Sequence, residues 1–477
     1  MRVALVASEA APFVKTGGLG DVVGALPDAL LRVDPELEVT TWLPLHRVLR
    51  DAVQGLTPGP WRHVSLGGRD EPVRLWERVR ERDRVVFVDA PGWFDREQLY
   101  GHRDGALRWA GFCRAVLDGC ADGVGGGVPD VLHAHDWQAS LALVWLKHRR
   151  IAGLEHTRGV LTIHNLAYQG RWDGSLAGAL DLQDQLHFDR MEWHGQLNYL
   201  KGGIEAAEVV TTVSPTYARE VLGPEHGQGL DAHLRHHASK LVGILNGLDD
   251  SWDPEADPAL PAPFSVEELE GKAACREALA RELGIDGDGP LLGVVARFTE
   301  QKGLDLVLAA APELVAEGAR LAVLGTGDQH LEDGFRELAR RFDRRVGVRV
   351  AFDGDVARRV LAGSDVLLMP SRFEPCGLTQ MQAMRYGTVP VAHAVGGLRD
   401  TVLDPGDGPL MAGEGTGFRF EHPTVEGLLW ATRRALRCRQ EDREGWRRLM
   451  RAVMRRDWRW DGPAARTLEV YRSLGAP

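Results

Sequence analysis

The residues best suited to chemistry lie in the segment 371–380 (SRFEPCGLTQ). Its carboxylate, Glu374, comes after an apolar strand pattern and before a helical one, and ligands of open parallel sheets bind at such strand ends. Gly377 lets the backbone approach a ligand closely, while the amides of Leu378 and Thr379 would begin the helix and favour an anion. The loop therefore offers a carboxylate for sugar hydroxyls beside amides for a phosphate, as a nucleotide-sugar requires. Taken alone, an exposed turn with a solvated glutamate explains it equally well.

Two further strand-to-helix loops carry positive charge. The first, residues 15–21 (KTGGLGD), places Lys15 beside glycines that leave backbone amides bare, although it matches neither the GxGxxG fingerprint nor a P-loop. The second holds Arg297 and Lys302 between a strand pattern and a helix. Cations at these positions suit a diphosphate, because charge-assisted hydrogen bonds contribute about 1.5–3 kcal/mol each. For the glycine loop alone, a mobile turn with a solvated lysine is the alternative.

Histidines end two more strand patterns in the first half of the chain. The stretch 131–138 (VLHAHDWQ) predicts a strand that runs into a polar loop, and 159–166 (GVLTIHNL) predicts a strand that ends at His164. His164 could donate to a substrate oxygen or be a satisfied core histidine. The earlier pair of histidines has no ligand cluster nearby, so it indicates sugar-hydroxyl binding and ring stacking, or a packed strand end, rather than a metal site.

Composition narrows the classes of function. With 57 basic and 68 acidic residues the net charge is −11, which argues against general binding to nucleic acid or membrane surfaces. No apolar run approaches the ~18 residues that a membrane span needs. The five cysteines are scattered and contain no CxxC pair, which favours a reducing compartment without disulfides or structural zinc. We therefore expect a cytoplasmic protein with no membrane and no nucleic-acid partner.

Strand and helix patterns alternate through both halves of the chain. Two runs of this kind predict two doubly wound α/β domains. Closely spaced prolines mark a linker between them, and we place it at residues 248–264. A cleft between the two domains would bring the loops of both halves to one ligand.

Seven segments, in order along nearly the whole chain, resemble motifs of the starch and glycogen synthase family of retaining glucosyltransferases. They are residues 15–21 (KTGGLGD), 133–137 (HAHDW), 162–165 (TIHN), 213–218 (VSPTYA), 245–247 (LNG), Arg297 with 301–305 (QKGLD), and 371–380 (SRFEPCGLTQ). Several of these matches are weak singly, but together they are specific.

The resemblance implies the GT-B architecture. In it, two Rossmann-like doubly wound domains face a central cleft, and C-terminal helices pack back toward the N-terminal domain. We accordingly expect an N-terminal domain over residues 1–247 on the glucan acceptor side and a hinge over 248–264. A C-terminal domain over 265–457 would bind the nucleotide-sugar donor, and a helix over 458–477 would cross back to the first domain.

The resemblance also implies a reaction, the transfer of glucose from ADP-glucose to the non-reducing end of an α-1,4-glucan (glycogen or a maltooligosaccharide). The anomeric configuration would be retained, ADP released, and no metal or other cofactor needed. The catalytic residues implied are His164, Arg297, Lys302 and Glu374. Donor binding would add Lys15, Gly17, Gly18, Asp21, Asn165, Asn246, Cys376, Gly377, Leu378 and Thr379. The acceptor would contact His133, His135, Asp136, Trp137 and Tyr168.

The roles that follow from this likeness leave some alternatives open. Arg297 and Lys302 would neutralise the departing diphosphate, where fixed cations stabilise developing charge. Glu374 would hold glucose hydroxyls, and whether it is also a nucleophile is open. Gln382 stands eight residues after Glu374, where related retaining transferases often carry an acid, which favours a front-face mechanism assisted by ADP over a two-carboxylate one. A sucrose-synthase-like transferase, a phosphorylase and a catalytically silent glucan-binding protein are the competing hypotheses, and the nucleotide base and oligomeric state are open.

Overall fold

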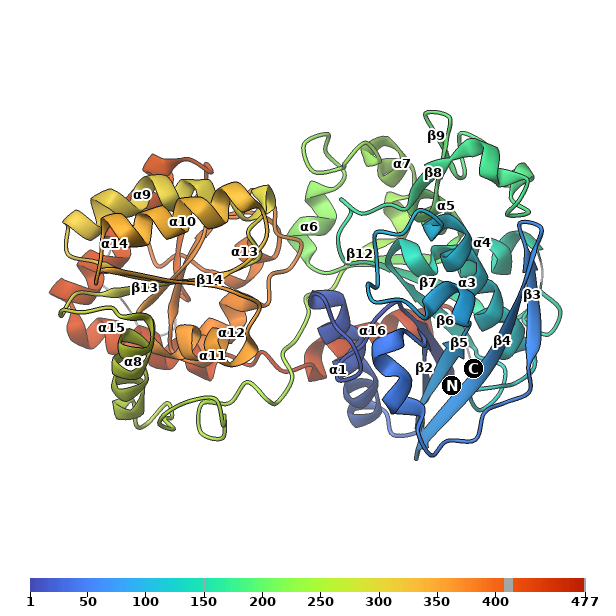
Figure 1. The fold of residues 1–477 in the computed structure, drawn as a ribbon, viewed down its shortest axis with the longest axis horizontal. Helices are drawn as coiled ribbons and strands as arrows, with labels where there is room; N and C mark the ends of the chain where they lie inside the picture. The colour runs from blue at the N-terminus through green and yellow to red at the C-terminus, as the bar shows by residue number, and fades with distance from the viewer. Residues whose placement is uncertain (150, 407–414, 476–477) are drawn as a thin grey trace. The chain divides into compact units, whose positions relative to one another are not determined.

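The computed structural model describes residues 1–149, 151–406 and 415–475. The chain divides into two compact units, one built from Met1–Gly247 with Trp460–Pro477 and the other from Leu248–Arg459 (Figure 1). Each unit has a predominantly parallel sheet covered by helices, which confirms the predicted pair of Rossmann-like α/β domains. Parts of two predicted segments lie outside the described residues. They are residues 407–414 of the C-terminal domain and residues 476–477 of the final helix.

The sheet of the first unit is built around β1 (Arg2–Val6), whose apolar residues are buried as expected of a central parallel strand. It pairs in parallel with β2 on one side and β6 on the other, so the strand order reverses beside it. Only the β3–β4–β5 edge of this sheet is antiparallel among the described strands. In spatial order the strands are β12 (Leu241–Gly243), β11 (Val209–Thr212), β7 (Arg158–Ile163), β6 (Val131–His135), β1, β2 (Glu38–Pro44), β5 (Asp83–Asp89), β4 (Arg69–Arg80) and β3 (Arg62–Leu66).

A small antiparallel sheet and a set of helices complete the first unit. The sheet has the order β8 (Arg171–Asp173), β10 (Gln196–Asn198) and β9 (Glu192–Trp193). The helices are α1 (Gly18–Val33), α2 (Pro91–Phe94), α3 (Gly105–Ala121), α4 (Asp136–Arg149), α5 (Tyr199–Ala206), α6 (Pro215–Glu220), α7 (Asp231–His236) and α16 (Asp461–Ser473).

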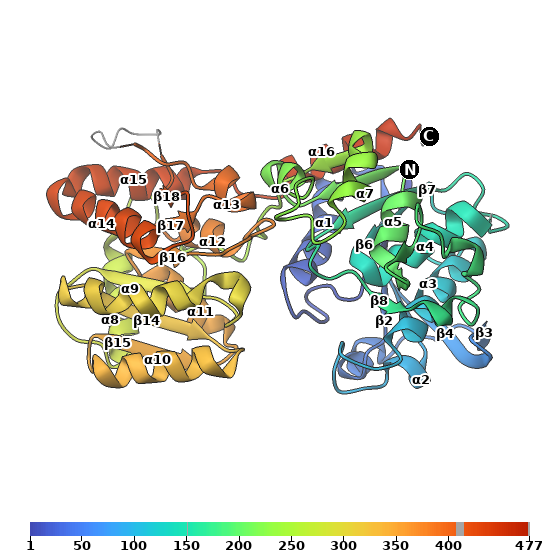
Figure 2. The same cartoon turned by 90° about the horizontal axis from the view of Figure 1, so that it is seen from above.

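Helix α16 comes from the far end of the chain and packs beside α1 (Figure 2). Its apolar face, with Leu468 and Tyr471, joins the buried cluster that contains Val3 and Leu30. Ion pairs flank this apolar contact, with Arg32 2.9 Å from Asp461 and Arg472 2.7 Å from Asp34. The expectation that the C-terminal end of the chain packs back on the first domain is thereby confirmed.

The sheet of the second unit is parallel throughout its described strands. Its order is that of a dinucleotide-binding sheet, with the first and fourth strands of the unit, β13 and β16, side by side. In spatial order the strands are β15 (Val346–Val350), β14 (Arg320–Gly325), β13 (Leu291–Val295), β16 (Val366–Met369), β17 (Val389–His393) and β18 (Phe418–Phe420). The helices are α8 (Glu270–Leu283), α9 (Leu304–Ala316), α10 (Gln329–Arg341), α11 (Gly354–Gly363), α12 (Thr379–Arg385), α13 (Gly396–Thr401), α14 (Val425–Glu441) and α15 (Arg443–Arg455).

Arg358 is one of the residues that tie the proline-rich segment 248–264 to the rest of the second unit. Arg358 donates to the carbonyl of Ser251 and to the carboxylate of Asp257, both at 2.7 Å. Its guanidinium also lies 4.1 Å from the centre of the Trp252 ring. These bonds fix the segment that the prolines predicted as a linker onto the second unit.

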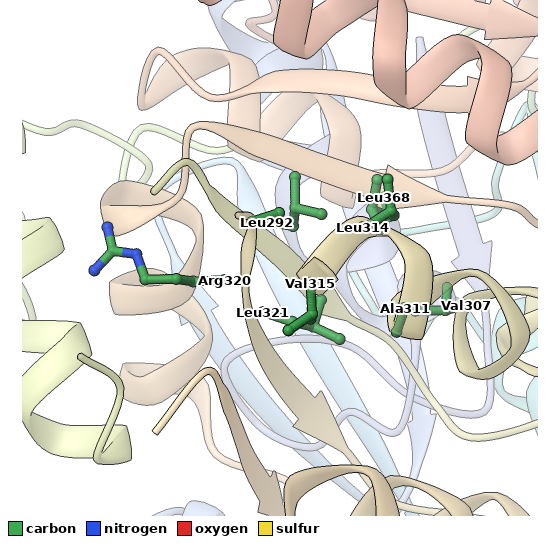
Figure 3. Close-up of a pocket in the computed structure, with 9 residues that line it drawn as sticks. Leu292, Val307, Ala311, Leu314, Val315, Arg320, Leu321 and Leu368 are labelled. Carbon is green, nitrogen blue, oxygen red and sulfur yellow. The ribbon is translucent and has the colours of Figure 1, made fainter. Parts of the chain in front are cut away.

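The core of the second unit contains one small void between the sheet and α9 (Figure 3). Its volume is ≈ 10 Å³ and its lining is apolar, with the charged end of Arg320 turned away. A space of this size holds one water at most, and it offers no polar partner for it. The void is therefore a packing gap and not a ligand site. It is lined by Leu292, Val307, Ala311, Leu314, Val315, Ala319, Leu321 and Leu368.

The contact between α16 and β6 can be tested through stability. The hydroxyl of Tyr471 lies 2.7 Å from Nδ1 of His133, and both side chains are buried. Tyr471→Phe keeps the ring but leaves this nitrogen without its partner, so we expect the free energy of unfolding to fall by about 1–2 kcal/mol. Urea unfolding measures the change. Arg472→Ala on the same helix removes only an exposed ion pair and should change stability by less than about 0.5 kcal/mol. Equal stabilities of Tyr471→Phe and the wild type would contradict the account.

Candidate functional site

Four of the predicted site residues lie where the two sheets reverse their strand order. In the first unit Lys15 follows β1 and Asp136 follows β6, and these strands are neighbours. In the second unit the loops after β13 and β16 carry Lys302 and Glu374, and these strands are also neighbours. Crevices at the carboxyl ends of such strand pairs are where open α/β sheets bind ligands. The two groups of residues are described separately below.

In the second unit, two of the predicted catalytic residues are in direct contact. Nζ of Lys302 lies 2.6 Å from Oε2 of Glu374, and the side chains are 18% and 7% exposed. The hydroxyl of Ser371 donates to the same carboxylate oxygen at 2.9 Å. From the sequence, Lys302 was predicted to direct its charge at a bound anion. In the structure a carboxylate already compensates that charge.

Hydrogen bonds from neighbouring elements hold the loop of Glu374 in place. The backbone N–H of Gly397, in α13, donates to the Glu374 carbonyl at 3.0 Å. Nδ1 of His393, at the end of β17, lies 2.7 Å from the carbonyl of Ser371. Gln301 donates to the Phe373 carbonyl at 3.1 Å, which ties the loops after β13 and β16 together. The carboxylate is thus presented by a loop that is fixed from three sides.

The glycine of this loop is required by its geometry. Gly377 has φ of 70°, and a Cβ there would meet the Gln380 side chain at 2.4 Å. Cys376 is buried, and the amide of Gln380 donates to its carbonyl at 3.1 Å. Helix α12 begins at Thr379, with Leu378 as its N-cap, and it has seven residues. The predicted helix start is therefore present, but so short a helix adds little to anion binding beyond its free amides.

Arg297 differs from Lys302 in its surroundings. It follows β13, its side chain is exposed, and no described residue bonds to its guanidinium. It is therefore available to a ligand at no cost in broken contacts. Gln382 lies within α12, and the structure gives it no contact that would distinguish a chemical role from packing.

In the first unit, the glycine loop is held by two carboxylates. Lys15 pairs with Asp21 at 2.6 Å, and both side chains are partly exposed. Buried Glu9 accepts the backbone N–H of Thr16 at 2.5 Å and its hydroxyl at 3.2 Å. Helix α1 begins at Gly18 directly after Gly17, so the amides of this loop form the start of a 16-residue helix. The sequence analysis missed Glu9, although its place just after a buried strand is the signal that marked the other loops.

The histidines after β6 and β7 form a buried row. His133 is 2% exposed and His135 0%, and their rings stack with centroids 4.2 Å apart. Nδ1 of His135 lies 2.9 Å from Nε2 of His164. His133 and His135 were predicted to contact the acceptor, and that role stays a prediction. Because both rings are buried, an indirect role is favoured over direct contact with the acceptor.

Asp136 joins this row through the backbone. It accepts the N–H of His164 at 2.7 Å, and its own φ is 57°, an uncommon conformation for a residue other than glycine. Burial, together with the nearby charge of Glu9, raises its pKa to about 7. The sequence predicted a polar loop here, which is wrong. Helix α4 begins at Asp136 itself, so the positive φ makes the turn from strand to helix in a single residue.

The remaining predicted residues differ in exposure. Trp137 packs among aromatic rings, with centroids 6.0 Å from Trp109 and 5.9 Å from Trp172, so much of its surface is used inside the unit. Tyr168 is 52% exposed and open to an acceptor. The side-chain amide oxygen of Asn165 accepts the backbone N–H of Ala167 at 3.0 Å. Asn246 is half-buried just after β12.

Tyr100, which the sequence analysis also missed, lies close to the glycine loop. Its hydroxyl is 2.8 Å from that of Ser8, at the end of β1, and its ring stacks on Trp109. His46 lies on the other side of Ser8, with Nε2 3.1 Å from the Ser8 carbonyl. No motif marked these two residues, because each comes from an element far from Ser8 in the sequence.

Two features of the described residues bear on cofactors and membranes. Within the described ranges, no three histidine, cysteine, aspartate or glutamate side chains are grouped so as to hold a metal ion. None of the helices in the described part of the chain is long and apolar enough to cross a membrane.

Both halves of the chain match models of known protein families. The starch synthase catalytic domain model matches residues 2–236, and the glycosyl transferases group 1 model matches residues 276–451. A glycogen synthase of Anaeromyxobacter sp. (strain Fw109-5) is 47% identical over 100% of both chains. A glycogen synthase of Roseobacter denitrificans (strain ATCC 33942 / OCh 114) is 43% identical over 99% of each.

Solved structures extend the comparison to the fold. The catalytic domain of starch synthase IV from Arabidopsis thaliana, bound to ADP and acarbose, matches with a TM-score of 0.91 and 35% identity over 99% of each chain. A sucrose-phosphate synthase from Thermosynechococcus elongatus matches with a TM-score of 0.62 and 18% identity, over 100% of this chain and 99% of that one, which shows a shared fold alone. The GT-B architecture predicted from the motifs is confirmed.

The buried histidines predict how stability depends on pH. Burial lowers the pKa of His133 and of His164 from 6.5 to about 3. Between these values the unfolded chain binds protons that the folded rings refuse, so acid favours unfolding. Asp136 opposes this, because its raised pKa makes the folded state bind a proton that the unfolded chain releases above pH 3.8. Burial also lowers the pKa of His135, the ring between them, well below 6.5. Three histidines against one aspartate leave about two net protons.

We therefore expect the free energy of unfolding to fall by about 2.7 kcal/mol per pH unit between pH 6 and 4.5 from this cluster. Urea unfolding across that range measures the slope. His133→Gln should flatten it by about one proton, or about 1.4 kcal/mol per unit. His187→Gln, at an exposed histidine, is the matched control and should keep the wild-type slope. A slope that His133→Gln leaves unchanged would mean that His133 titrates normally.

Proposed function

Because this chain belongs to the starch and glycogen synthase family of retaining glycosyltransferases, we propose that it extends an α-1,4-glucan with glucose from ADP-glucose. Glucose is added at the non-reducing end, the anomeric configuration is retained and ADP is released. The observation that carries the proposal is the contact of Lys302 with Glu374 beside β13 and β16. A cation and a carboxylate 2.6 Å apart support this proposal, because one nucleotide-sugar offers a phosphate to the first and sugar hydroxyls to the second.

Lys302 and Arg297 stabilise the leaving group. Breaking the glycosidic bond puts negative charge on the distal phosphate, where fixed cations stabilise the transition state. A bound diphosphate competes with Glu374 for Lys302, and exposed Arg297 binds it without giving up a partner. Amides from Gly377 to Thr379 add donors on the same side. We infer that these groups, rather than a metal ion, neutralise the diphosphate.

The hydrogen bonds of Glu374 favour an orienting role over nucleophilic attack. One of its oxygens already accepts from Lys302 and from Ser371, which stabilises the carboxylate and makes that oxygen a weak nucleophile. Gln382 offers no second carboxylate. We infer that Glu374 binds glucose hydroxyls, while a phosphate oxygen of the departing ADP takes the proton of the acceptor hydroxyl on the same face of the sugar. Attack from that face accounts for retention.

We propose that residues of the first unit also bind the donor and the acceptor. Lys15, with the amides at the start of α1, binds phosphate after exchanging Asp21 for the ligand. His164 and Asn165, at the end of β7, and Asn246, after β12, bind the glucose hydroxyls. Asp136, Trp137 and Tyr168 lie on the acceptor side. The five cysteines, all of which the structure describes, form no disulfide with one another, in keeping with a cytoplasmic enzyme.

Incubation of the purified protein with ADP-glucose and a maltooligosaccharide tests the proposal. We expect ADP release in step with chain growth, with the α-linkage identified by sensitivity of the product to an α-glucan hydrolase. UDP-glucose in place of ADP-glucose tests the base preference. If neither ADP release nor chain growth were observed, the remaining hypothesis would be a catalytically silent glucan-binding protein.

Two substitutions separate the roles of the cations. Arg297→Ala and Lys302→Ala should each lower kcat by ~10²-fold or more, the usual scale for loss of one charge-stabilising group. Only Lys302→Ala leaves Glu374 as a buried carboxylate without its cation, so only this variant should also lose stability, by about 2–4 kcal/mol. Steady-state kinetics and urea unfolding measure the two effects. Wild-type turnover in either variant would refute the role given to that cation.

A further inference from the structure

Three histidine rings form a row at the carboxyl ends of β6 and β7. Besides the stack of His133 on His135, the rings of His135 and His164 stack with centroids 5.2 Å apart. Nδ1 of His135 and Nε2 of His164 are at hydrogen-bond distance, 2.9 Å. A bond between two neutral imidazoles has one donor and one acceptor, so its direction fixes the tautomer of both rings. The surroundings of the row decide that direction.

The outer end of the row is ordered by Tyr471. Its hydroxyl bonds Nδ1 of His133, and no other described residue accepts from it, so it donates to this nitrogen. Nε2 of His133 then carries the proton and donates to the hydroxyl of Thr162 at 2.6 Å. Thr162 donates in turn to Thr211 at 2.6 Å. The reverse direction would bury the Tyr471 O–H without an acceptor, which is unfavourable.

The middle ring has one nitrogen without a partner. Nε2 of His135 is buried, and no described residue bonds to it. If His135 accepted from His164, this nitrogen would carry a buried N–H with no acceptor. If His135 donates through Nδ1, the same nitrogen is a bare lone pair, and buried orphan donors are the rarer and costlier case. His135 is therefore the donor and Nε2 of His164 the acceptor.

We propose that His135 is a positioning residue that fixes His164 as the tautomer with its proton on Nδ1. No described residue bonds to Nδ1 of His164, so this N–H is available to a substrate oxygen. The stack on His133, which Tyr471 and Thr162 hold at both nitrogens, keeps the His135 ring in the plane that the bond to His164 needs. The inference rests on the proposed function only for the identity of that oxygen, a hydroxyl of the transferred sugar.

The charged and titratable groups around His164 support a neutral donor. Those facing it are His135 and, beyond it, His133 on β6, and Asp136, which binds its backbone N–H. Glu9, in the loop after β1, interacts with Asp136 rather than with the ring. A neutral Nδ1–H donates to a sugar hydroxyl without adding a positive charge.

Nitrogen-15 NMR of histidine side chains tests the tautomer directly, without substrate. Long-range ¹⁵N–¹H correlations distinguish a protonated Nδ1 from a protonated Nε2, and His164→Gln identifies the His164 signals by their loss. We expect a neutral ring with the proton on Nδ1 at pH 7.5. A proton on Nε2, or an imidazolium, would overturn the proposal whatever the enzyme's activity. If the tautomer is as expected but no glucan is extended, the proposed function fails and the positioning role stands.

Two variants of His135 test whether it sets the tautomer. In His135→Asn the amide nitrogen occupies the place of Nδ1 and still donates, so His164 should keep its Nδ1 proton and kcat should fall less than ~3-fold. His135→Leu has the bulk but no donor, so His164 should become a mixture of tautomers and kcat should fall ~10-fold or more, with KM for ADP-glucose changed less. Circular dichroism checks that both fold. A folded His135→Leu with the wild-type kcat and an unchanged His164 tautomer would overturn the proposal. If that variant does not fold, the tautomer of His164 in the wild type decides whether the proposal stands.

Discussion

The contact between Lys302 and Glu374 depends on one property of parallel sheets, that adjacent strands end at the same edge. Lys302 follows β13 and Glu374 follows β16, 72 residues later, yet the neighbouring strands bring their charges together. A lysine and a glutamate so little exposed would each be costly alone, because an unpaired buried charge loses its hydration. Together, and with Ser371 as a further donor, they form a stable polar centre. The strand order therefore lets the two charges compensate each other, and the rest of the second unit preserves that order.

The first unit uses the same kind of strand edge in a different way. At the ends of β6 and β7 it places a row of neutral rings, and burial holds the pKa values of His133 and His164 near 3. Hydrogen bonds, not charges, fix their orientation, and the last of them comes from Tyr471 on a helix that begins at Asp461. Both units thus present a lysine paired with a carboxylate, and the first adds the row of neutral rings. This combination suits a ligand that has an anionic end and a hydroxyl-rich end.

The sequence predicts the fold well because local patterns carry it. Strands β1, β6, β7, β13 and β16 follow from apolar runs that end in glycine and polar residues. The sequence does not predict β2, β3 or β4. It also misses the helix start at Asp136, because a single residue with positive φ replaces the turn that a loop would need. Nor could it give the contacts of the site. Tyr471 meets His133 across 338 residues, and nothing in either segment points to the other.

The pairing of Lys302 with Glu374 also bears on how binding energy can serve catalysis. Only interactions that strengthen between the ground state and the transition state raise the rate. A lysine shared between a carboxylate and a phosphate gains most when the phosphate becomes more negative, which happens as the glycosidic bond breaks. If Lys302 binds the phosphate as proposed, Glu374 competes for it in every state of the donor, and the phosphate competes best when it is most negative. Exposed Arg297 has no such partner among the described residues, so as a phosphate ligand it would act without this competition, although both residues follow β13.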